Sequence, residues 1–294
     1  MFIIMGWLTN NYNKRSSKKY GWHPSWFNSS LQEINNDLEL AVRMFQQKND
    51  LEIDGKVGPQ TFRRILAERD LDEGDNYILI DGQQVNIDCK VKIDLLPKNC
   101  YRTHRRTRKP NMIVTHWDAT TSAEKCKRVL QARKISSHFC IDNDGTIYQY
   151  VDTNHTAWHA GKVNKYSIGI DFTNAYYMKY SSYYKKNHGE RPICSNSKIH
   201  GVKLKPHLGY YPQQLEAYKK LIKVLCSNYA IALQTPPVDG VYDQAADGIY
   251  NGIVCHYHLT RNKIDCAGLP LKKMIAEMRI PPSRNVIDII KNES

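Results

Sequence analysis

The sequence contains no long hydrophobic run. No stretch approaches the roughly 20 apolar residues that a membrane-spanning helix needs, so we expect no transmembrane segment. The apolar start, residues 1–5, is too short for the core of a secretory signal and has no basic flank before it. We therefore expect the protein to be made in the cytoplasm and to depend on something else for any route outward.

Cysteine pairs at the spacing of metal or redox motifs are also missing. The eight cysteines are scattered along the chain without CxxC spacing. In a cytoplasmic chain, such cysteines are more often free and buried than joined in a disulfide framework. We therefore expect free and mostly buried thiols.

Negative charge is scarce relative to positive charge. The chain has 42 Lys and Arg against 29 Asp and Glu, a formal net charge of +13, which favours polyanionic partners such as nucleic acid, an anionic membrane or a bacterial wall polymer. One basic run stands out: Arg102, Arg105, Arg106, Arg108 and Lys109. Because no stacking aromatics are interleaved through it, nucleic-acid binding is not expected. A solvated linker is the first interpretation of this run, and contact with an anionic wall or outer-membrane polymer is the second.

Residues 1–70 show helical periodicity only in their second half. Apolar residues there recur at helical spacing and predict one buried helix face: Leu40, Ala41, Met44 and Phe45. Asp54-Gly55 indicates a tight turn and Gly58-Pro59 restarts the chain, after which a second apolar face follows: Phe62, Ile65 and Leu66. We predict a small all-α domain of two short helices, with residues 1–30 unassigned.

The rest of the chain reads as a connector followed by an α/β domain. Residues 71–110 are expected to connect the two domains and to contain short strands on either side of Asp81-Gly82. Beyond them, apolar runs predict strands at 112–115, 139–141, 147–151, 166–172 and 252–255, and amphipathic runs predict helices at 121–134 and 213–226. Strands alternating with helices predict a mixed central β-sheet flanked by helices over residues 111–294. Residues 174–211 are expected to be a long surface insertion.

Four residues from distant segments suggest a hydrolytic metal site. His116 and His256 each stand where a predicted strand ends, a position from which a side chain can reach a cleft. Asp265 follows in the next loop, and Lys263 stands two residues before it. Zinc in a hydrolase takes three protein ligands of this kind and an open fourth position. Spacing alone does not distinguish a metal site from two histidines that have structural roles.

Several motifs carry a family resemblance. They are Ile113–His116, Ile135–Gln149, Ala157–Gly161, Ser167–Asp171 and the segment from Cys255 to Asp265. In this order they resemble the zinc-dependent N-acetylmuramoyl-L-alanine amidases of the peptidoglycan-recognition-protein fold, over residues 113–268. The resemblance implies a Zn²⁺ ion held by His116, His256 and Asp265. Cys266 is a rival third ligand because some members use cysteine, but the lysine two residues earlier favours Asp265.

The same resemblance implies the catalytic residues. One branch of the family has a tyrosine before the hairpin histidine, whereas this chain has Ser137 before His138. It therefore resembles the other branch, in which an acid at the position of Asp171 is catalytic. That branch implies Asp171 as general base and Lys263 as the cation that stabilises the oxyanion. Trp158 and His159 are expected to line the cleft and contact substrate, and His138 is expected to be structural.

A second resemblance concerns the helical domain. The string from Ala41 to Phe62 is similar to the peptidoglycan-binding domain common in wall hydrolases. Together the two resemblances imply an enzyme that hydrolyses the amide bond between N-acetylmuramic acid and L-alanine in peptidoglycan. A bacteriophage endolysin, made in the host cytoplasm and acting on the wall after release, is the expected role, with a virion-carried enzyme as its alternative.

Two other functions are alternatives to the amidase. A non-catalytic peptidoglycan-recognition protein is the runner-up. Binders of this fold typically lose a metal ligand, whereas all three ligands have candidates here. A nucleic-acid-binding protein comes third, because it rests on charge alone.

Overall fold

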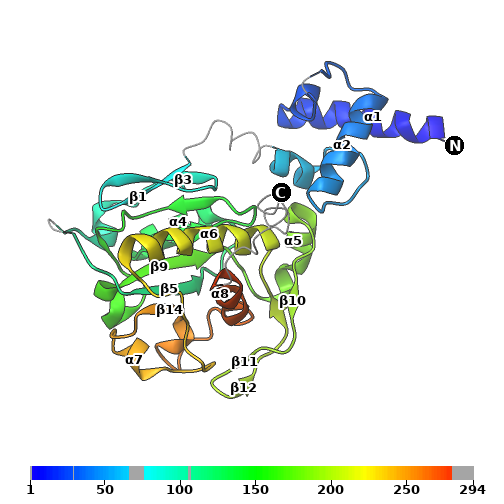
Figure 1. Ribbon diagram of the computed structural model, residues 1–294. Helices are drawn as coiled ribbons and strands as arrows, with labels where there is room; N and C mark the ends of the chain where they lie inside the picture. The colour runs from blue at the N-terminus through cyan, green and yellow to red at the C-terminus, as the bar shows by residue number, and fades with distance from the viewer. Residues whose placement is uncertain (1, 29, 66–75, 105–106, 280–294) are drawn as a thin grey trace, which may run out of the picture.

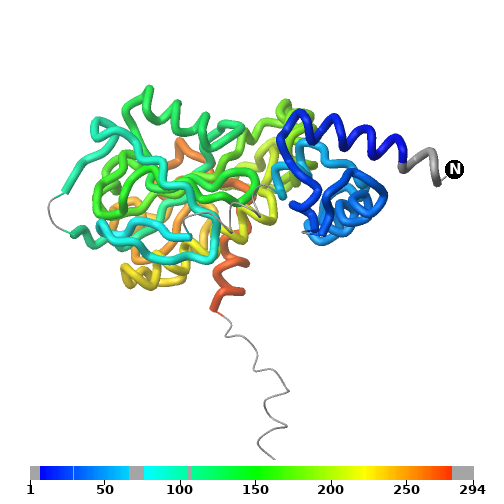
Figure 2. The backbone as a smooth tube through the Cα atoms, turned by 90° about the horizontal axis from the view of Figure 1, so that it is seen from above, coloured from blue at the N-terminus to red at the C-terminus, as the bar shows by residue number. Residues whose placement is uncertain are grey.

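The computed structural model describes residues 2–28, 30–65, 76–104 and 107–279 (Figure 1). A small helical module lies to one side of a larger α/β domain, and Figure 2 shows the same arrangement from above. The expected fold class is confirmed: a mixed sheet flanked by helices follows an all-α N-terminal part. Among the described residues, no helix is both long and apolar enough to span a membrane.

The unassigned N-terminal residues form a helix of the small module. Helix α1 (Phe2–Tyr20) lies across α2 (Asn36–Lys48) and buries the side chain of Asn13. The Asn13 amide donates to the Gly55 carbonyl (3.0 Å) and accepts from the Val57 N–H (2.8 Å). These two bonds satisfy the backbone of the turn that joins the two predicted helices. Trp22, fully buried after α1, completes the small core.

The buried face of α2 differs from the predicted one. Leu40 and Met44 are 60% and 64% exposed, whereas the buried face consists of Leu38, Val42, Phe45 and Gln46. Gln46 is inside because its side chain bonds the turn, donating to Asp54 and the Lys56 carbonyl and accepting from the Gly55 N–H. Hydrogen bonding to this turn fixes which stripe of α2 is turned inward. The second helix, over residues 59–65, packs Phe62 against Tyr20 as expected of an apolar face; Leu66 lies outside the described residues.

A six-stranded sheet forms the centre of the larger domain. In spatial order its strands are β14 (Gly252–Cys255), β5 (Met112–Trp117), β9 (Ser167–Phe172), β6 (Phe139–Ile141), β7 (Ile147–Gln149) and β3 (Val91–Ile93). All neighbours are parallel except β6 and β7, which form the expected antiparallel hairpin. Helices α6 (Pro212–Tyr229) and α8 (Leu271–Arg279) pack on one face, and α4 (Ala123–Arg133) packs on the other. Six of the eight cysteines are buried and all are free, as expected.

The segment expected to be a connector contributes to this domain. Strands β1 (Tyr77–Ile80) and β2 (Gln83–Asn86) pair around the Asp81-Gly82 turn, as predicted. Alternate residues of β1, Ile78 and Ile80, are buried in the same core as α6. Strand β3 then joins the sheet beside β7. The segment is therefore part of the α/β domain as well as a connection to it.

The basic run before β5 is not simply a solvated linker. Arg108 is only 8% exposed, and its guanidinium donates to the backbone carbonyls of Thr153, His155, Asn164, Lys165 and Ser167. The loops on both sides of β8 (Thr156–Ala157) are thereby tied to the start of β9. Lys109 and Arg102 are exposed, and Arg105 and Arg106 lie outside the described residues.

We expect Arg108→Ala to lower the free energy of unfolding by about 3 kcal/mol, because it leaves several buried carbonyls without a donor. Urea denaturation followed by circular dichroism measures the change. Lys109→Ala removes a neighbouring exposed charge and is the matched control. Equal midpoints for the two variants would contradict the structural role of Arg108.

The expected surface insertion has a small core of its own. It contains α5 (Ser181–His188) and four two-residue strands: β10 (Ile193–Cys194), β11 (Lys198–Ile199), β12 (Val202–Lys203) and β13 (His207–Leu208). Buried Arg191 donates to the Thr173 and Gly209 carbonyls and lies over the rings of Tyr184 and Tyr211. Helix α5 also meets the helical module, where Gln60 donates to the Lys185 carbonyl (2.7 Å). The insertion therefore joins the two parts of the molecule.

Candidate metal centre

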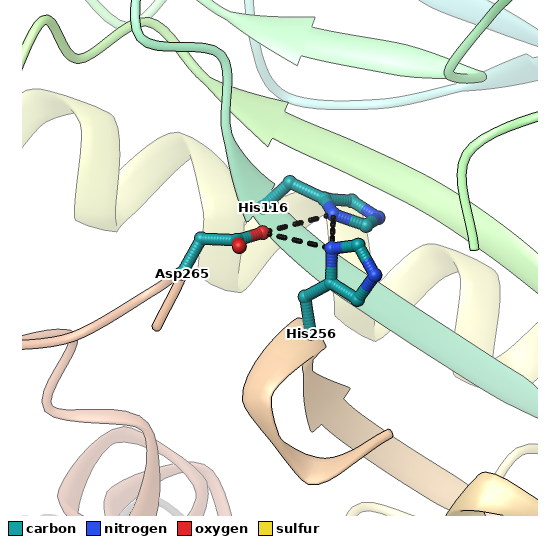
Figure 3. A group of neighbouring side chains, drawn as sticks. All are labelled: His116, His256 and Asp265. Carbon is teal, nitrogen blue, oxygen red and sulfur yellow. Dashed lines mark hydrogen bonds and ion pairs between the residues drawn. The ribbon is translucent and has the colours of Figure 1, made fainter. Parts of the chain in front are cut away.

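Two histidines and one carboxylate meet at the ends of adjacent strands. β5 carries His116, and His256 directly follows β14, the parallel neighbour of β5. The two Nδ1 atoms are 3.0 Å apart, and each is 3.1 Å from Oδ2 of Asp265 (Figure 3). Strand pairing thus positions the histidines, and the loop after His256 brings the acid to them.

This triangle of atoms has the shape that a metal ion requires. A tetrahedral zinc with bonds of 2.0–2.1 Å holds N and O ligands roughly 3.4 Å apart, close to the 3.0–3.1 Å separations seen here. Two ring nitrogens that face each other and one carboxylate oxygen are a donor set typical of zinc hydrolases. The residues present therefore fit a zinc ion.

The protonation states also suit a ligand role. Burial lowers the pKa of His116 to about 4, so its imidazole is neutral at neutral pH and offers a lone pair. Burial alone would raise the pKa of Asp265, but hydrogen bonds to His116 and His256 outweigh it and lower the pKa below its ordinary value. A neutral imidazole and an ionised carboxylate are the forms that bind a metal.

His159 lies directly behind His116. Its Nδ1 is 3.0 Å from Nε2 of His116, and its Nε2 is 3.3 Å from the Ser167 hydroxyl. The ring fits because residue 169 is glycine: a Cβ there would lie 2.8 Å from the ring of His159. We expected His159 to contact substrate. The structure places His159 on the pocket wall. There its contact with His116 holds the imidazole ring of His116, whose other side faces the carboxylate of Asp265.

We expect His159→Ala to weaken zinc binding roughly 10- to 100-fold, the usual effect of removing a partner of a metal-bound histidine. Competition with a chromophoric chelator measures the affinity. His159→Gln keeps an acceptor for the Nε2–H of His116 and should retain most of the zinc affinity. Wild-type zinc affinity in His159→Ala would remove this residue from the centre.

One pocket of about 430 Å³ joins all the residues predicted for the site. Its lining includes His116, His256, Asp265, Asp171, Lys263 and Trp158. Asp171 pairs in register with His116 across β9 and β5, so the two side chains share one face of the sheet. Lys263 is exposed at the same pocket. The fold therefore collects residues that lie up to 149 positions apart.

The environment of Asp171 favours proton uptake. Its side chain is 7% exposed, and burial raises its pKa well above the ordinary value. The charge of nearby Asp118 raises this pKa further, while the Ser137 hydroxyl opposes the shift. A carboxylate tuned in this direction can accept a proton close to neutral pH.

Cys266, the rival third ligand, stands apart from the triangle, and so do His258 and His138. Cys266 is buried and interacts with Cys255 rather than with the two histidines. His258 accepts from the Cys255 N–H and faces the Val238 carbonyl. His138 accepts from the Gly169 N–H, which agrees with the structural role expected of it.

Part of the pocket wall was not predicted from the sequence. Tyr176, from the insertion, stacks on Trp117 with ring centroids 4.3 Å apart, and both line the pocket. Asp118 and Arg133 line it as well. Trp117 and Asp118 directly follow His116, and this adjacency was the only signal available from the sequence.

Two family models match the chain. Residues 106–268 match the model described as N-acetylmuramoyl-L-alanine amidase, and residues 20–65 match a putative peptidoglycan binding domain. The chain belongs to the N-acetylmuramoyl-L-alanine amidase family. Both predicted resemblances are thereby confirmed: this amidase combines the family's catalytic domain with an N-terminal peptidoglycan-binding module.

Solved structures of two amidases and one endolysin are similar to this one. The amidase LysC from Clostridium intestinale is 18% identical, with 65% of this chain and 99% of that chain covered and a TM-score of 0.41. A mutant endolysin from Bacillus subtilis is 19% identical, with coverages of 64% and 98% and a TM-score of 0.38. The amidase AmiD from E. coli is 19% identical, with coverages of 74% and 73% and a TM-score of 0.40. No curated protein matches the sequence.

Proposed function

We propose that this amidase is a zinc-dependent hydrolase that cleaves the bond between N-acetylmuramic acid and L-alanine in peptidoglycan. One observation carries the proposal: His116, His256 and Asp265 converge within 3.1 Å of one another in a member of the N-acetylmuramoyl-L-alanine amidase family. A complete ligand set disfavours the alternative of a non-catalytic recognition protein.

The pocket residues have separate roles in the proposed reaction. Zinc, when bound, polarises the scissile carbonyl and lowers the pKa of water at the site. Asp171 accepts a proton from the attacking water and passes it to the leaving amine as the C–N bond breaks. The ammonium of Lys263 stabilises the negative charge that develops on the carbonyl oxygen. Trp158, on the pocket wall, contacts the substrate.

The helical module serves to hold the enzyme on its polymeric substrate. It matches a peptidoglycan-binding family, and its Gln60 donates a hydrogen bond to the Lys185 carbonyl of α5. The net charge of +13 suits an anionic wall or outer-membrane surface. The biological role we propose is wall lysis by a bacteriophage endolysin, with delivery on the virion as the alternative.

Digestion of purified peptidoglycan, with and without a chelator, tests the reaction and its metal. We expect stem peptides that begin at L-alanine, identified by mass, to be released by the untreated enzyme. Chelation should stop their release and added zinc should restore it. Tight binding to the wall without any released peptide would instead support the recognition protein, and chelator-resistant release would remove zinc from the proposal.

A further inference from the structure

A second cluster of metal-binding side chains lies beside the amidase centre. The carboxylate of Asp118 and the thiols of Cys126 and Cys140 have ligand atoms that all lie within 4.8 Å of one another. Asp118 follows β5, Cys126 is on α4 and Cys140 is on β6. Within the described parts of the chain, only this group and the His116, His256 and Asp265 group have such an arrangement.

Strand register separates the two clusters. His116 on β5 pairs with Asp171 on β9, and Asp171 pairs with Cys140 on β6. Neighbouring strands are 4.7–4.9 Å apart, so the backbones at His116 and Cys140 are about 10 Å apart. The base Asp171 lies between them. The thiol cluster is therefore a site of its own and not an extension of the histidine triangle.

Its dimensions suit a tetrahedral ion with sulfur ligands. Bonds of about 2.3 Å to sulfur and about 2.0 Å to a carboxylate oxygen hold these two tetrahedral ligands roughly 3.5 Å apart, and Cys140 Sγ is 3.8 Å from Oδ2 of Asp118. The carboxylate is already oriented, because its Oδ1 accepts from the Thr120 and Asn174 N–H groups. Oδ2 accepts from the Thr120 hydroxyl and from the Cys140 thiol.

The cluster is also accessible. Asp118 and Cys126 line the same pocket as Asp171, which gives an ion a route to these two ligands, and Cys140 is fully buried. Buried cysteines usually serve as small apolar residues, and burial raises the pKa of Cys140 to about 11. Here two buried thiols lie beside an ordered carboxylate at a pocket wall, and apolar packing alone does not account for this arrangement.

We propose that Asp118, Cys126 and Cys140 form a second metal site that takes a thiophilic divalent ion such as Zn²⁺ or Cd²⁺. Thiolates select such soft ions over Mg²⁺ and Ca²⁺. Binding forms two metal–sulfur bonds and releases the two thiol protons to solvent. The site does not depend on the proposed reaction, because it shares no ligand with the histidine triangle.

Cadmium titration of the full chain, first loaded with one equivalent of Zn²⁺, tests the site. We expect a further equivalent of Cd²⁺ to bind, with a thiolate-to-cadmium charge-transfer band and release of about two protons per ion. Cys126→Ala and Cys140→Ala should each lose the band. Cys226→Ala, which removes a buried thiol from α6, is the matched control and should keep it. His116→Ala should also keep it, which distinguishes this site from the amidase centre.

Three outcomes would overturn the proposal. They are the absence of a band in the wild type, its persistence in both thiol variants, and its loss only in Cys255→Ala, which would assign it to the buried Cys255–Cys266 pair. If an alanine variant fails to fold, Asp118→Asn provides the second test. This substitution keeps the shape of the side chain and should weaken cadmium binding at least tenfold, and an unchanged affinity would contradict the site.

Discussion

Replacing His116 by alanine will abolish zinc binding at the amidase centre and lower the rate of amide hydrolysis by at least about 10³-fold. This decrease is larger than the one caused by removing a single hydrogen-bond donor to the oxyanion. The reason is geometric. His116 Nδ1 lies 3.0 Å from His256 Nδ1 and 3.1 Å from Asp265 Oδ2, so its removal leaves two ligands where zinc needs three. Release of stem peptides from peptidoglycan measures activity, and atomic absorption measures bound zinc.

The control for this variant is another histidine. His23→Ala removes an exposed imidazole from the helical module, far in the chain from the three ligands, and should keep both zinc and activity. In the wild type, chelation should remove the activity and zinc should restore it, whereas zinc should not rescue His116→Ala. A folded His116→Ala variant that still releases peptides at the wild-type rate would show that this triangle is not the catalytic centre.

The positions of the two histidines were predictable because both stand at strand ends. Short apolar runs before His116 and His256 predict buried parallel strands, and the ends of neighbouring parallel strands meet at one edge of a sheet. The alternation of Ile168, Ile170 and Phe172 predicts that Asp171 lies on the other face of its strand, and in the structure pairing of β9 with β5 puts Asp171 in register with His116. Local patterns give these positions, whereas the ligand set and the roles of Asp171 and Lys263 are implied only by the family resemblance.

Buried polar residues were the part that the sequence could not reveal. Arg108 and Asn13 are inside because backbone groups from distant segments bond their side chains. Gln46 is buried for the same reason, and this is why the observed buried face of α2 differs from the predicted one. Hydrophobic periodicity ranks such residues as exposed, and only the three-dimensional fold shows which carbonyls and N–H groups they satisfy.

Replacing Asp171 by asparagine will lower turnover by roughly 10²–10⁴-fold, the usual worth of a general base. It should also raise the free energy of unfolding at neutral and alkaline pH by about 1 kcal/mol, because it removes a charge that is costly to bury. The asparagine keeps the size of the side chain but cannot accept the proton. Peptide release and urea denaturation measure the two effects separately.

The pH dependence of the stability gain follows from the direction of the pKa shift. The folded state raises the pKa of Asp171 above the ordinary value of 3.8, so the folded protein disfavours the ionised carboxylate. This cost is fully present above the folded-state pKa and disappears as pH falls below 3.8. The advantage of Asp171→Asn should therefore be seen at pH 8 and shrink steadily in acid.

Lys263→Ala provides the matched contrast, because Lys263 is exposed at the same pocket. Its loss should lower turnover by roughly 10²–10³-fold, as expected of one oxyanion-stabilising group, and leave the unfolding midpoint unchanged. Zinc should remain bound in both variants, since neither residue is a ligand. Both substitutions should therefore lower the rate, but only replacement of the buried Asp171 should change the stability. If Asp171→Asn lost stability as well as activity, the carboxylate would be a structural hydrogen-bond acceptor, and the base would have to be sought elsewhere in the pocket.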